Sequence, residues 1–302
     1  MNSKIIKYLS SYSYRFMIND YMGLYNKLDD RTYLVKKCKA KFGKSFNIDS
    51  PVTYNEKLQW LKLNNRNPKY TMMVDKYLVR NYIKDMIGDK YLIPLLGVWD
   101  NAKDIDFDDL PNKFVLKCNH NSGGGMVICK DKSALDIERT RRELNENLGI
   151  NYYKKNREWP YKNVKPRIIA EQYMEDSKTK ELRDYKFFCF DGEVKFMFVA
   201  TDRQKDGEEV KFDFFDENYN HLPVKQGHEN ASTIPNKPLQ FDLMKELAKK
   251  LSNGIPHVRV DFYEVDGEVF FGEMTFYHFS GFVPFVPEEW DKIFGDLISL
   301  PI

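Results

Sequence analysis

Through much of the first hundred residues, apolar side chains recur every three or four positions, and this spacing predicts helices. Thr53 with Glu56 three residues later forms a capping box, which predicts that a helix begins there. A second helix is expected after Asp75, with Gly88 at its end. Residues 91–99 are then almost continuously apolar around one proline, which predicts a strand or an extended segment.

Short apolar runs bounded by turn residues dominate the rest of the chain, and such runs predict strands. The runs 114–116 and 126–128 enclose a Ser-Gly-Gly-Gly turn and predict a hairpin. Paired runs around Asp-Gly at 191–192 and at 266–267 predict two more hairpins, because Asp-Gly suits a tight turn. Residues 167–173 predict a buried strand.

Two helices are expected among these strands, at residues 133–148 and at the amphipathic segment 239–251. Residues 151–166 are polar, aromatic and basic without a clear period, which predicts a mobile loop. Helices first, then a hairpin with a helix, then paired strands, is an α+β pattern. We therefore expect a helical N-terminal region at 1–105, a subdomain with the glycine-rich hairpin at 106–175, and a strand-rich C-terminal subdomain at 176–302.

The composition supports a sizeable core and argues against global disorder, since 42% of the 302 residues are hydrophobic and 15% are aromatic. The 47 basic and 45 acidic residues leave a formal net charge of only +2, which argues against nucleic-acid binding driven by a strong positive field. The four cysteines form no Cys-x-x-Cys pair, which argues against a zinc site or a redox dithiol. Buried, reduced thiols in a cytosolic protein are therefore expected.

No apolar run approaches the roughly 18 residues that a membrane-spanning helix needs, and the N-terminus lacks the uninterrupted apolar segment of a signal peptide. Residues 1–25 nonetheless mix Lys4, Lys7 and Arg15 with many tyrosines and aliphatic side chains. A helix packed on its own domain is the expected structure of this segment, and peripheral contact with a membrane surface is the alternative. We therefore expect a cytoplasmic protein, with the inner face of the membrane as its alternative position.

The sharpest local motif is the loop Ser122–Gly125, with Lys117 at the end of the strand before it. Successive glycines let the backbone approach a ligand closely, and their N–H groups can form an anion-binding concavity. A nearby lysine adds a point charge suited to phosphate. The motif is neither a Walker A nor a dinucleotide fingerprint, because both place their glycines before a helix. A phosphate lid is one interpretation, and an ordinary hairpin turn with a solvated lysine is the other.

A second motif combines one arginine with two carboxylates. Arg259 and Asp261 lie on one face of a predicted strand because side chains alternate along it. If the chain reverses at 266–267, Glu273 lies on the neighbouring strand, and the two carboxylates can share a cation. Mg²⁺ takes such ligands together with phosphates and water, and an arginine beside them suits phosphoryl transfer. The alternative is a pair of edge charges that Arg259 neutralises.

A third motif begins where the strand at 167–173 reaches Glu171, and further acids follow at Glu181 and Asp184. The backbone at such a strand end can offer donors and acceptors to an adenine edge, and a later acid can hold ribose hydroxyls. A strand end followed by a charged loop is the simpler alternative.

The order of these motifs resembles that of the ATP-grasp superfamily, in which a lysine and a glycine hairpin precede a strand ending in glutamate and a carboxylate hairpin. More closely, the chain resembles the TupA-like branch, which is associated with teichuronopeptide and other bacterial surface polysaccharides. The resemblance covers residues 50–290 and little of the first 45. It is carried by Tyr54–Leu61, Asp75–Arg80, Tyr91–Asp100, Phe114–Val127, Glu171–Phe188 and Arg259–Phe282.

The resemblance implies an ATP-grasp fold, in which ATP lies between two α+β subdomains under the glycine hairpin. Arg259 would stabilise the transferring phosphoryl group, and Lys117 would contact phosphates and the purine side of the nucleotide. The nucleotide-binding residues that the resemblance implies are Lys76, Lys117, Ser122, Gly123, Gly124, Gly125, Glu171, Tyr173, Lys186 and, for the ribose, Glu181 or Asp184. Mg²⁺ would be bound by Asp261, Glu273 and Thr275. Many relatives have Asn at the position of Thr275, so this ligand departs from the family pattern.

The resemblance also implies a reaction, in which ATP activates a carboxylate as an acyl phosphate and an amine then forms an amide. The implied partners are ATP, Mg²⁺, a carboxylated sugar or glycan precursor such as a uronic acid, and an amine or amino acid. Aromatic and basic side chains of residues 152–165 could face the sugar. The alternatives are phosphorylation of a glycan hydroxyl, glycosyl transfer, and ATP binding without catalysis. His120 and His278 are expected to be structural or supporting residues rather than bases.

Overall fold

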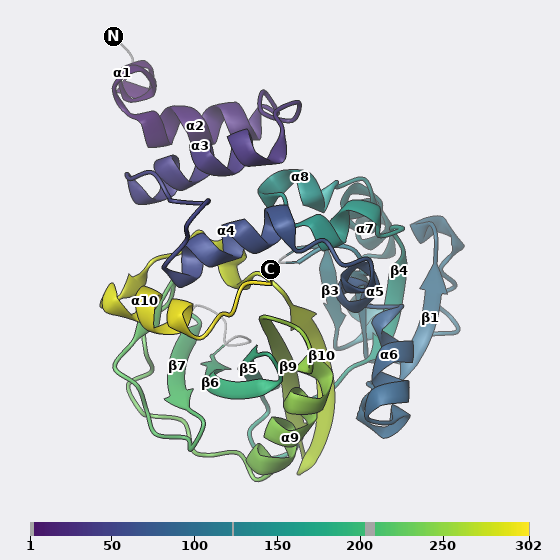
Figure 1. Cartoon of the computed structure of the whole chain (residues 1–302). Helices are drawn as coiled ribbons and strands as arrows, with labels where there is room; N and C mark the ends of the chain where they lie inside the picture. The colour runs from purple at the N-terminus through teal and green to yellow at the C-terminus, as the bar shows by residue number, and fades with distance from the viewer. Residues whose placement is uncertain (1–2, 123, 203–208, 302) are drawn as a thin grey trace.

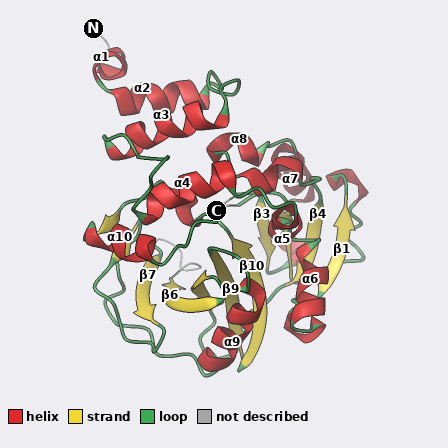
Figure 2. Cartoon of the chain, in the orientation of Figure 1, coloured by secondary structure: helices red, strands yellow, loops and turns green. Residues whose placement is uncertain are grey.

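Two antiparallel sheets form the frame of the protein in a computed structural model that describes residues 3–122, 124–202 and 209–301 (Figures 1 and 2). The four-stranded sheet has the order β1 (Leu95–Trp99), β4 (Ile168–Gln172), β2 (Phe114–Cys118), β3 (Met126–Cys129). The five-stranded sheet has the order β10 (Glu268–Thr275), β9 (Val258–Val265), β5 (Asp184–Phe190), β6 (Glu193–Thr201), β7 (Lys211–Asp216). A small pair joins β8 (Lys225–Gln226) to β11 (Phe285–Val286).

Helices surround the sheets and form an extension at the N-terminal end of the molecule (Figure 1). The α-helices of the described residues are α1 (Ser3–Ser10), α2 (Tyr12–Tyr21), α3 (Asp30–Phe42), α4 (Tyr54–Asn64), α5 (Lys69–Val74), α6 (Val79–Met86), α7 (Ile137–Leu148), α8 (Tyr152–Asn156), α9 (Phe241–Ser252) and α10 (Glu289–Asp296). Short 3₁₀ helices include η2 (Ala102–Asp104), η4 (Trp159–Asn163) and η5 (His278–Gly281). None of these helices is both long and apolar enough to cross a membrane.

Local signals placed most of these elements correctly. Thr53 and Glu56 form the expected capping box, in which each side chain accepts a hydrogen bond from the other residue's backbone N–H. Asp136 caps α7, so that helix begins at Ile137 rather than at residue 133. The three predicted hairpins are β2–β3, β5–β6 and β9–β10, each paired antiparallel. The α+β fold class is confirmed.

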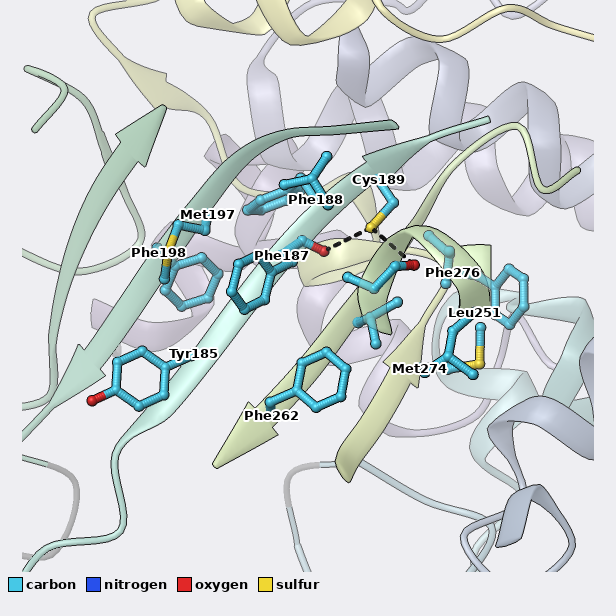
Figure 3. Close-up of a cluster of buried hydrophobic side chains, with 14 of the residues drawn as sticks. Tyr185, Phe187, Phe188, Cys189, Met197, Phe198, Leu251, Phe262, Met274 and Phe276 are labelled. Carbon is cyan, nitrogen blue, oxygen red and sulfur yellow. Dashed lines mark hydrogen bonds between the residues drawn. The ribbon is translucent and has the colours of Figure 1, made fainter. Parts of the chain in front are cut away.

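The main core lies over the five-stranded sheet and is rich in aromatic side chains (Figure 3). Phe187, Phe188 and Phe262 are fully buried there, and α9 packs the apolar side chains of Met244 and Leu251 against the same sheet. Burial of such side chains contributes about 1.5–3 kcal/mol each to folding. A smaller, separate core lies beneath the four-stranded sheet. All four cysteines are buried and reduced, as expected.

The prediction of a mobile loop at 151–166 is wrong, because the segment folds into α8 and η4 and is held by distant partners. Arg157 is only 2% exposed and donates a hydrogen bond of 2.9 Å to the carbonyl of Tyr25. Tyr33 and Lys37 of α3 both donate to the carbonyl of Lys155. These partners lie more than a hundred residues upstream, so the local pattern of the segment could not indicate them.

Candidate active site

A cavity of about 130 Å³ lies where the two sheets approach each other. The alternation of β2 explains how its floor is built, because Phe114, Leu116 and Cys118 are buried in the small core and Val115 and Lys117 line the cavity. The remaining lining residues are Ile93, Met126, Ile128, Glu171, Gln172, Tyr173, Met174, Leu182, Tyr263 and Gly272. The walls are thus largely apolar, with Lys117 and Glu171 as the charged groups.

Lys117 and Glu171 form an ion pair in this cavity. The Lys117 Nζ lies 2.6 Å from Glu171 Oε2, and Arg80 of α6 reaches Glu171 Oε1 at 3.5 Å. The pairing of β2 with β4 places Val115 opposite Glu171, which brings Lys117 within reach of the same carboxylate. Arg80 lies in Asp75–Arg80, one of the stretches that carry the resemblance, but sequence reasoning gave it no role, because its approach to Glu171 depends on the packing of α6.

Lys76 lies under the glycine-rich loop. Its Nζ donates to the carbonyl of Asn121, and Lys76 lines a second, smaller cavity together with Lys117 and Glu171. Burial lowers the pKa of Lys76, and the nearby Glu273 carboxylate opposes that shift. The sequence prediction that Lys76 and Lys117 approach one site agrees with this geometry.

Within the loop, both the backbone conformation at position 125 and the atoms around it require glycine. Its φ of +66° is unfavourable for residues with a side chain, and an added Cβ would lie 2.3 Å from Asn147 Cγ of α7. Ser122 and Gly124 are exposed, as a lid over a ligand would need, and Gly123 lies outside the described residues.

On the five-stranded sheet, Arg259 is the centre of a buried hydrogen-bond network. Its guanidinium donates two bonds to Asp261, at 2.7 Å to Oδ1 and 2.6 Å to Oδ2. Nη2, which makes the bond to Asp261 Oδ2, also donates to Glu273 Oε1 at 3.1 Å and to Thr275 Oγ1 at 3.0 Å. Nη1 donates to Nδ1 of His278 at 2.6 Å, so this histidine supports the arginine as expected.

A bulge in β10 places Glu273 beside Asp261. The register pairs Phe271 with Phe262 and Glu273 with Asp261, so Gly272 is the additional residue on its strand. A side chain would be crowded there, because a Cβ would lie 3.1 Å from the carbonyl oxygen of Asp261. The bulge therefore absorbs the one-residue difference between the two arms of the hairpin.

Positive charge from both sides of the cleft surrounds Glu273. Burial would raise the pKa of this carboxyl, but Lys186, Arg259 and Lys76 together hold its pKa at about 2. Lys186 also donates to Asp261 and lies 3.3 Å from Asp184. Because Lys76 belongs to the segment before α6, cations of two separate parts of the chain act on one carboxylate.

The family model described as TupA-like ATPgrasp matches residues 56–299. The chain belongs to this TupA-like ATP-grasp family. The expected family and the ATP-grasp fold are therefore confirmed. A comparison with curated protein sequences finds no similar protein.

Solved structures with a similar fold are distant from this TupA-like ATP-grasp protein. D-alanine–D-alanine ligase from Helicobacter pylori has 15% identity and a TM-score of 0.43, over 82% of this chain and 69% of that structure. L-amino acid ligase from Bacillus licheniformis has 13% identity and a TM-score of 0.45, over 84% of this chain and 55% of that structure. D-alanine–D-alanine ligase from Bacillus anthracis in complex with ATP has 13% identity and a TM-score of 0.40, over 68% of this chain and 53% of that structure. The chain thus spans about half to two thirds of their length, and likenesses this distant say nothing of individual residues.

The donor set at Asp261 and Glu273 fits a magnesium ion in this TupA-like protein. The two carboxylates are register partners on neighbouring strands, and the low pKa of Glu273 keeps it ionised. Hard oxygen ligands of this kind suit Mg²⁺, which commonly takes one or two carboxylates and completes its shell with phosphates and water. Thr275 donates to Glu273 Oε1 at 3.0 Å, so it orients that carboxylate. No group of three or more His, Cys, Asp or Glu side chains in the described residues is arranged to hold a metal.

The remaining predicted residues lie around the same cleft. Tyr173 lines the apolar cavity and donates to Glu175 at 2.6 Å, and burial with that carboxylate raises the pKa of Tyr173 to about 12. Asp184 is buried beside Lys186, whereas Glu181 lines an adjoining polar pocket and pairs with Arg183 at 3.2 Å. Both acids remain candidates for the ribose. Sequence reasoning missed Leu182 and Tyr263, which line the cavity between these positions.

Proposed function

We propose that this protein is an ATP-dependent carboxylate–amine ligase that attaches an amino acid or another amine to a uronic-acid carboxyl. The acceptor would be a bacterial capsular or cell-surface polysaccharide or its precursor. The proposal is carried by the positions of four cations: Lys76 and Lys117 line one cavity of the cleft, while Arg259 lies 3.1 Å from Glu273 and Lys186 donates to Asp261. A cleft with such a density of cations suits the polyphosphate of ATP.

The proposed reaction has two steps. A carboxylate oxygen of the glycan attacks the γ-phosphorus of ATP, the bond to the β-phosphate oxygen breaks, and ADP leaves. The amine nitrogen then attacks the carbonyl carbon of the acyl phosphate, phosphate leaves with one former carboxylate oxygen, and the amine loses a proton to solvent. The protein's part is to position the reactants and to stabilise charge.

Each residue of the cleft has a role in this proposal. Lys76 and Lys117 bind phosphates, the loop at Ser122–Gly125 closes over them, and Glu171 with the backbone at Tyr173 borders the adenine. Arg259 stabilises the phosphoryl group in transit, with its guanidinium already fixed by Asp261. Asp261 and Glu273 would hold Mg²⁺, which supplies positive charge to the polyphosphate when bound.

The wall at α8 and η4 is our candidate for the glycan side of the site. The rings of Tyr152 and Tyr161 meet edge to face with their centroids 4.7 Å apart, and Glu273 is among the charges that raise the pKa of both tyrosines after burial. Aromatic faces near the phosphate end of the cleft suit a sugar ring. We propose a cytoplasmic reaction, because ATP is available there and the four cysteines are reduced.

Product analysis tests the proposal. Purified protein with ATP and Mg²⁺ should release ADP and phosphate only when a uronic-acid glycan fraction and an amino-acid mixture are both present. Mass spectrometry should then find an amide on the glycan. ADP release with the phosphate retained on a sugar hydroxyl would instead identify a kinase, and ATP binding without turnover would identify a binding module.

The metal ligands can be tested in the same assay. Asp261→Asn and Glu273→Gln should each raise the Mg²⁺ concentration needed for half-maximal turnover. Full turnover by both variants at limiting Mg²⁺ would contradict their role.

A further inference from the structure

The first 45 residues differ strongly in charge from the rest of the chain. They contain ten lysines and arginines against three aspartates, which gives a formal charge of +7. The whole chain carries only +2, so the remaining residues carry −5. Such asymmetry concentrates positive potential at one end of the molecule and predicts an anionic partner for that end.

The same region exposes an unusual share of large apolar side chains. Among the described residues, 18 large apolar side chains are exposed, and seven of them fall within residues 5–24. They are Ile5, Ile6, Leu9, Met17, Tyr21, Met22 and Leu24. Leu9 of α1 is 64% exposed, and Tyr21 at the end of α2 is 92% exposed.

Helices α1, α2 and α3 form what we call the N-terminal surface, which stands away from the two sheets at one end of the molecule (Figure 1). On α3, Lys39 and Lys41 are exposed and Lys36 is half-buried. Lys7 lies 5.0 Å from the ring centre of Tyr14, and Lys39 lies 5.4 Å from that of Tyr12. Cations, tyrosines and exposed aliphatic side chains thus share one surface, which is the composition that favours a membrane interface.

We propose that the N-terminal surface docks on a lipid bilayer that contains anionic phospholipid. The apolar side chains of α1 and α2 enter the boundary between headgroups and acyl chains, and the lysines of α3 contact the headgroup charges. A second copy docked through the same surface is disfavoured as the occupant, because it would bring +7 against +7. A nucleic acid would account for the lysines but would leave the aliphatic side chains without a role.

The N-terminal surface is firmly joined to α8, the segment that we propose for the glycan side of the site. Tyr33 and Lys37 of α3 hold the carbonyl of Lys155 in α8, and Arg157 lies 4.3 Å from the ring centre of Tyr33. Asp30 accepts a hydrogen bond from Tyr153. Docking would therefore fix the orientation of the α8 wall to the membrane, while the lipid contact itself does not depend on the proposed ligase reaction.

Vesicle flotation of the full chain without ATP tests the docking. We expect the protein to float with vesicles of phosphatidylcholine containing about a third phosphatidylglycerol, and to bind phosphatidylcholine vesicles at least tenfold more weakly. Raised salt should weaken the binding to the anionic vesicles. Equal binding to both kinds of vesicle, or binding to neither, would overturn the proposal.

Matched variants separate the two contributions. Ile5→Ser with Leu9→Ser should weaken the partitioning about tenfold, and Lys36→Glu, Lys39→Glu and Lys41→Glu together about a hundredfold. The controls are Ile234→Ser with Leu239→Ser, which are exposed apolar residues elsewhere, and Lys178→Glu with Lys250→Glu. Equal losses in the control variants would contradict the assignment to this surface.

Two further measurements exclude the other occupants. Light scattering without lipid should give the same molecular mass for the wild type and for the Ile5→Ser, Leu9→Ser variant, because the N-terminal surface is not expected to mediate self-association. Added duplex DNA should not displace the protein from vesicles. Either opposite result would replace the bilayer with a second copy or with a nucleic acid.

Discussion

The two sheets bring charge to the cleft in different ways. On the four-stranded sheet, Lys117 and Glu171 form an ion pair with side chains 20% and 9% exposed, and Arg80 lies 3.5 Å from the same carboxylate. On the five-stranded sheet, Arg259 and Asp261 are 8% and 1% exposed and belong to a network with several partners. An ion pair that lines a cavity can be opened by an arriving nucleotide, whereas a buried network is fixed before substrate binds. We therefore expect the first sheet to govern ATP affinity and the second to govern the rate of phosphoryl transfer.

The largest effect is expected at Arg259. Arg259→Met should lower kcat about a thousandfold or more, because it removes the charge that stabilises the phosphoryl group in transit. It should also lower the free energy of unfolding by about 3 kcal/mol, since Asp261 stays buried after losing a partner. Steady-state ADP release and urea unfolding measure the two effects.

Arg259→Lys separates catalysis from folding. Lysine keeps the positive charge but has three donors on a single nitrogen, so it cannot replace the five hydrogen bonds that the Arg259 guanidinium makes. We expect a folded protein by circular dichroism with kcat still lowered at least tenfold. A folded Arg259→Lys protein with wild-type kcat would contradict the role of the network.

The next largest effect is expected at Lys117. Lys117→Met should raise the KM for ATP about tenfold to a hundredfold, with kcat changed far less, because a charged hydrogen bond to the nucleotide is lost. The control is Lys103→Met at an exposed lysine of η2, which should leave both constants unchanged. A decrease in kcat with an unchanged KM for ATP would contradict the claim that the four-stranded sheet governs ATP affinity.

How far the sequence could predict this cleft differs between its parts. The Asp-Gly hairpins and the Thr53 capping box depend on neighbouring residues, so local patterns identified them. Arg80, the fold of α8 and the bulge at Gly272 depend on contacts between distant segments, which composition and periodicity do not encode. The positions of Lys117, Arg259 and Asp261 were predictable because strand alternation fixes which side chains share a face.

A smaller effect is expected at the glycine-rich loop. Gly125→Ala should lower kcat/KM for ATP about fivefold, since the new Cβ and the positive φ displace the loop from Asn147. Gly254→Ala is the matched control, because its φ is +72° and no atom lies within 4 Å of the added Cβ. Thermal unfolding should show a loss of stability in both variants, larger for Gly125→Ala because of the contact with Asn147, and equal activity of the two would contradict a role for the loop.

The smallest effect concerns stability at low pH. The folded-state pKa of Glu273 is about 2, below its unfolded value of about 4.3, so its stabilising contribution is present above the unfolded value and is lost as the pH falls toward 2. Urea unfolding between about pH 5 and 2 should therefore show a shallower decline for Glu273→Gln than for the wild type. Parallel curves would mean that the cations of the cleft do not act on this carboxylate.

Transfer of labelled oxygen tests the central claim, that this cleft activates a carboxylate through phosphate. The uronic-acid carboxylates of the glycan fraction would be labelled with ¹⁸O and incubated with the protein, ATP, Mg²⁺ and an amino-acid mixture. We predict that each amide formed is accompanied by one inorganic phosphate that carries one labelled oxygen. Release of phosphate without label, or retention of both labelled oxygens on the glycan, would contradict the acyl phosphate and with it the proposed ligase.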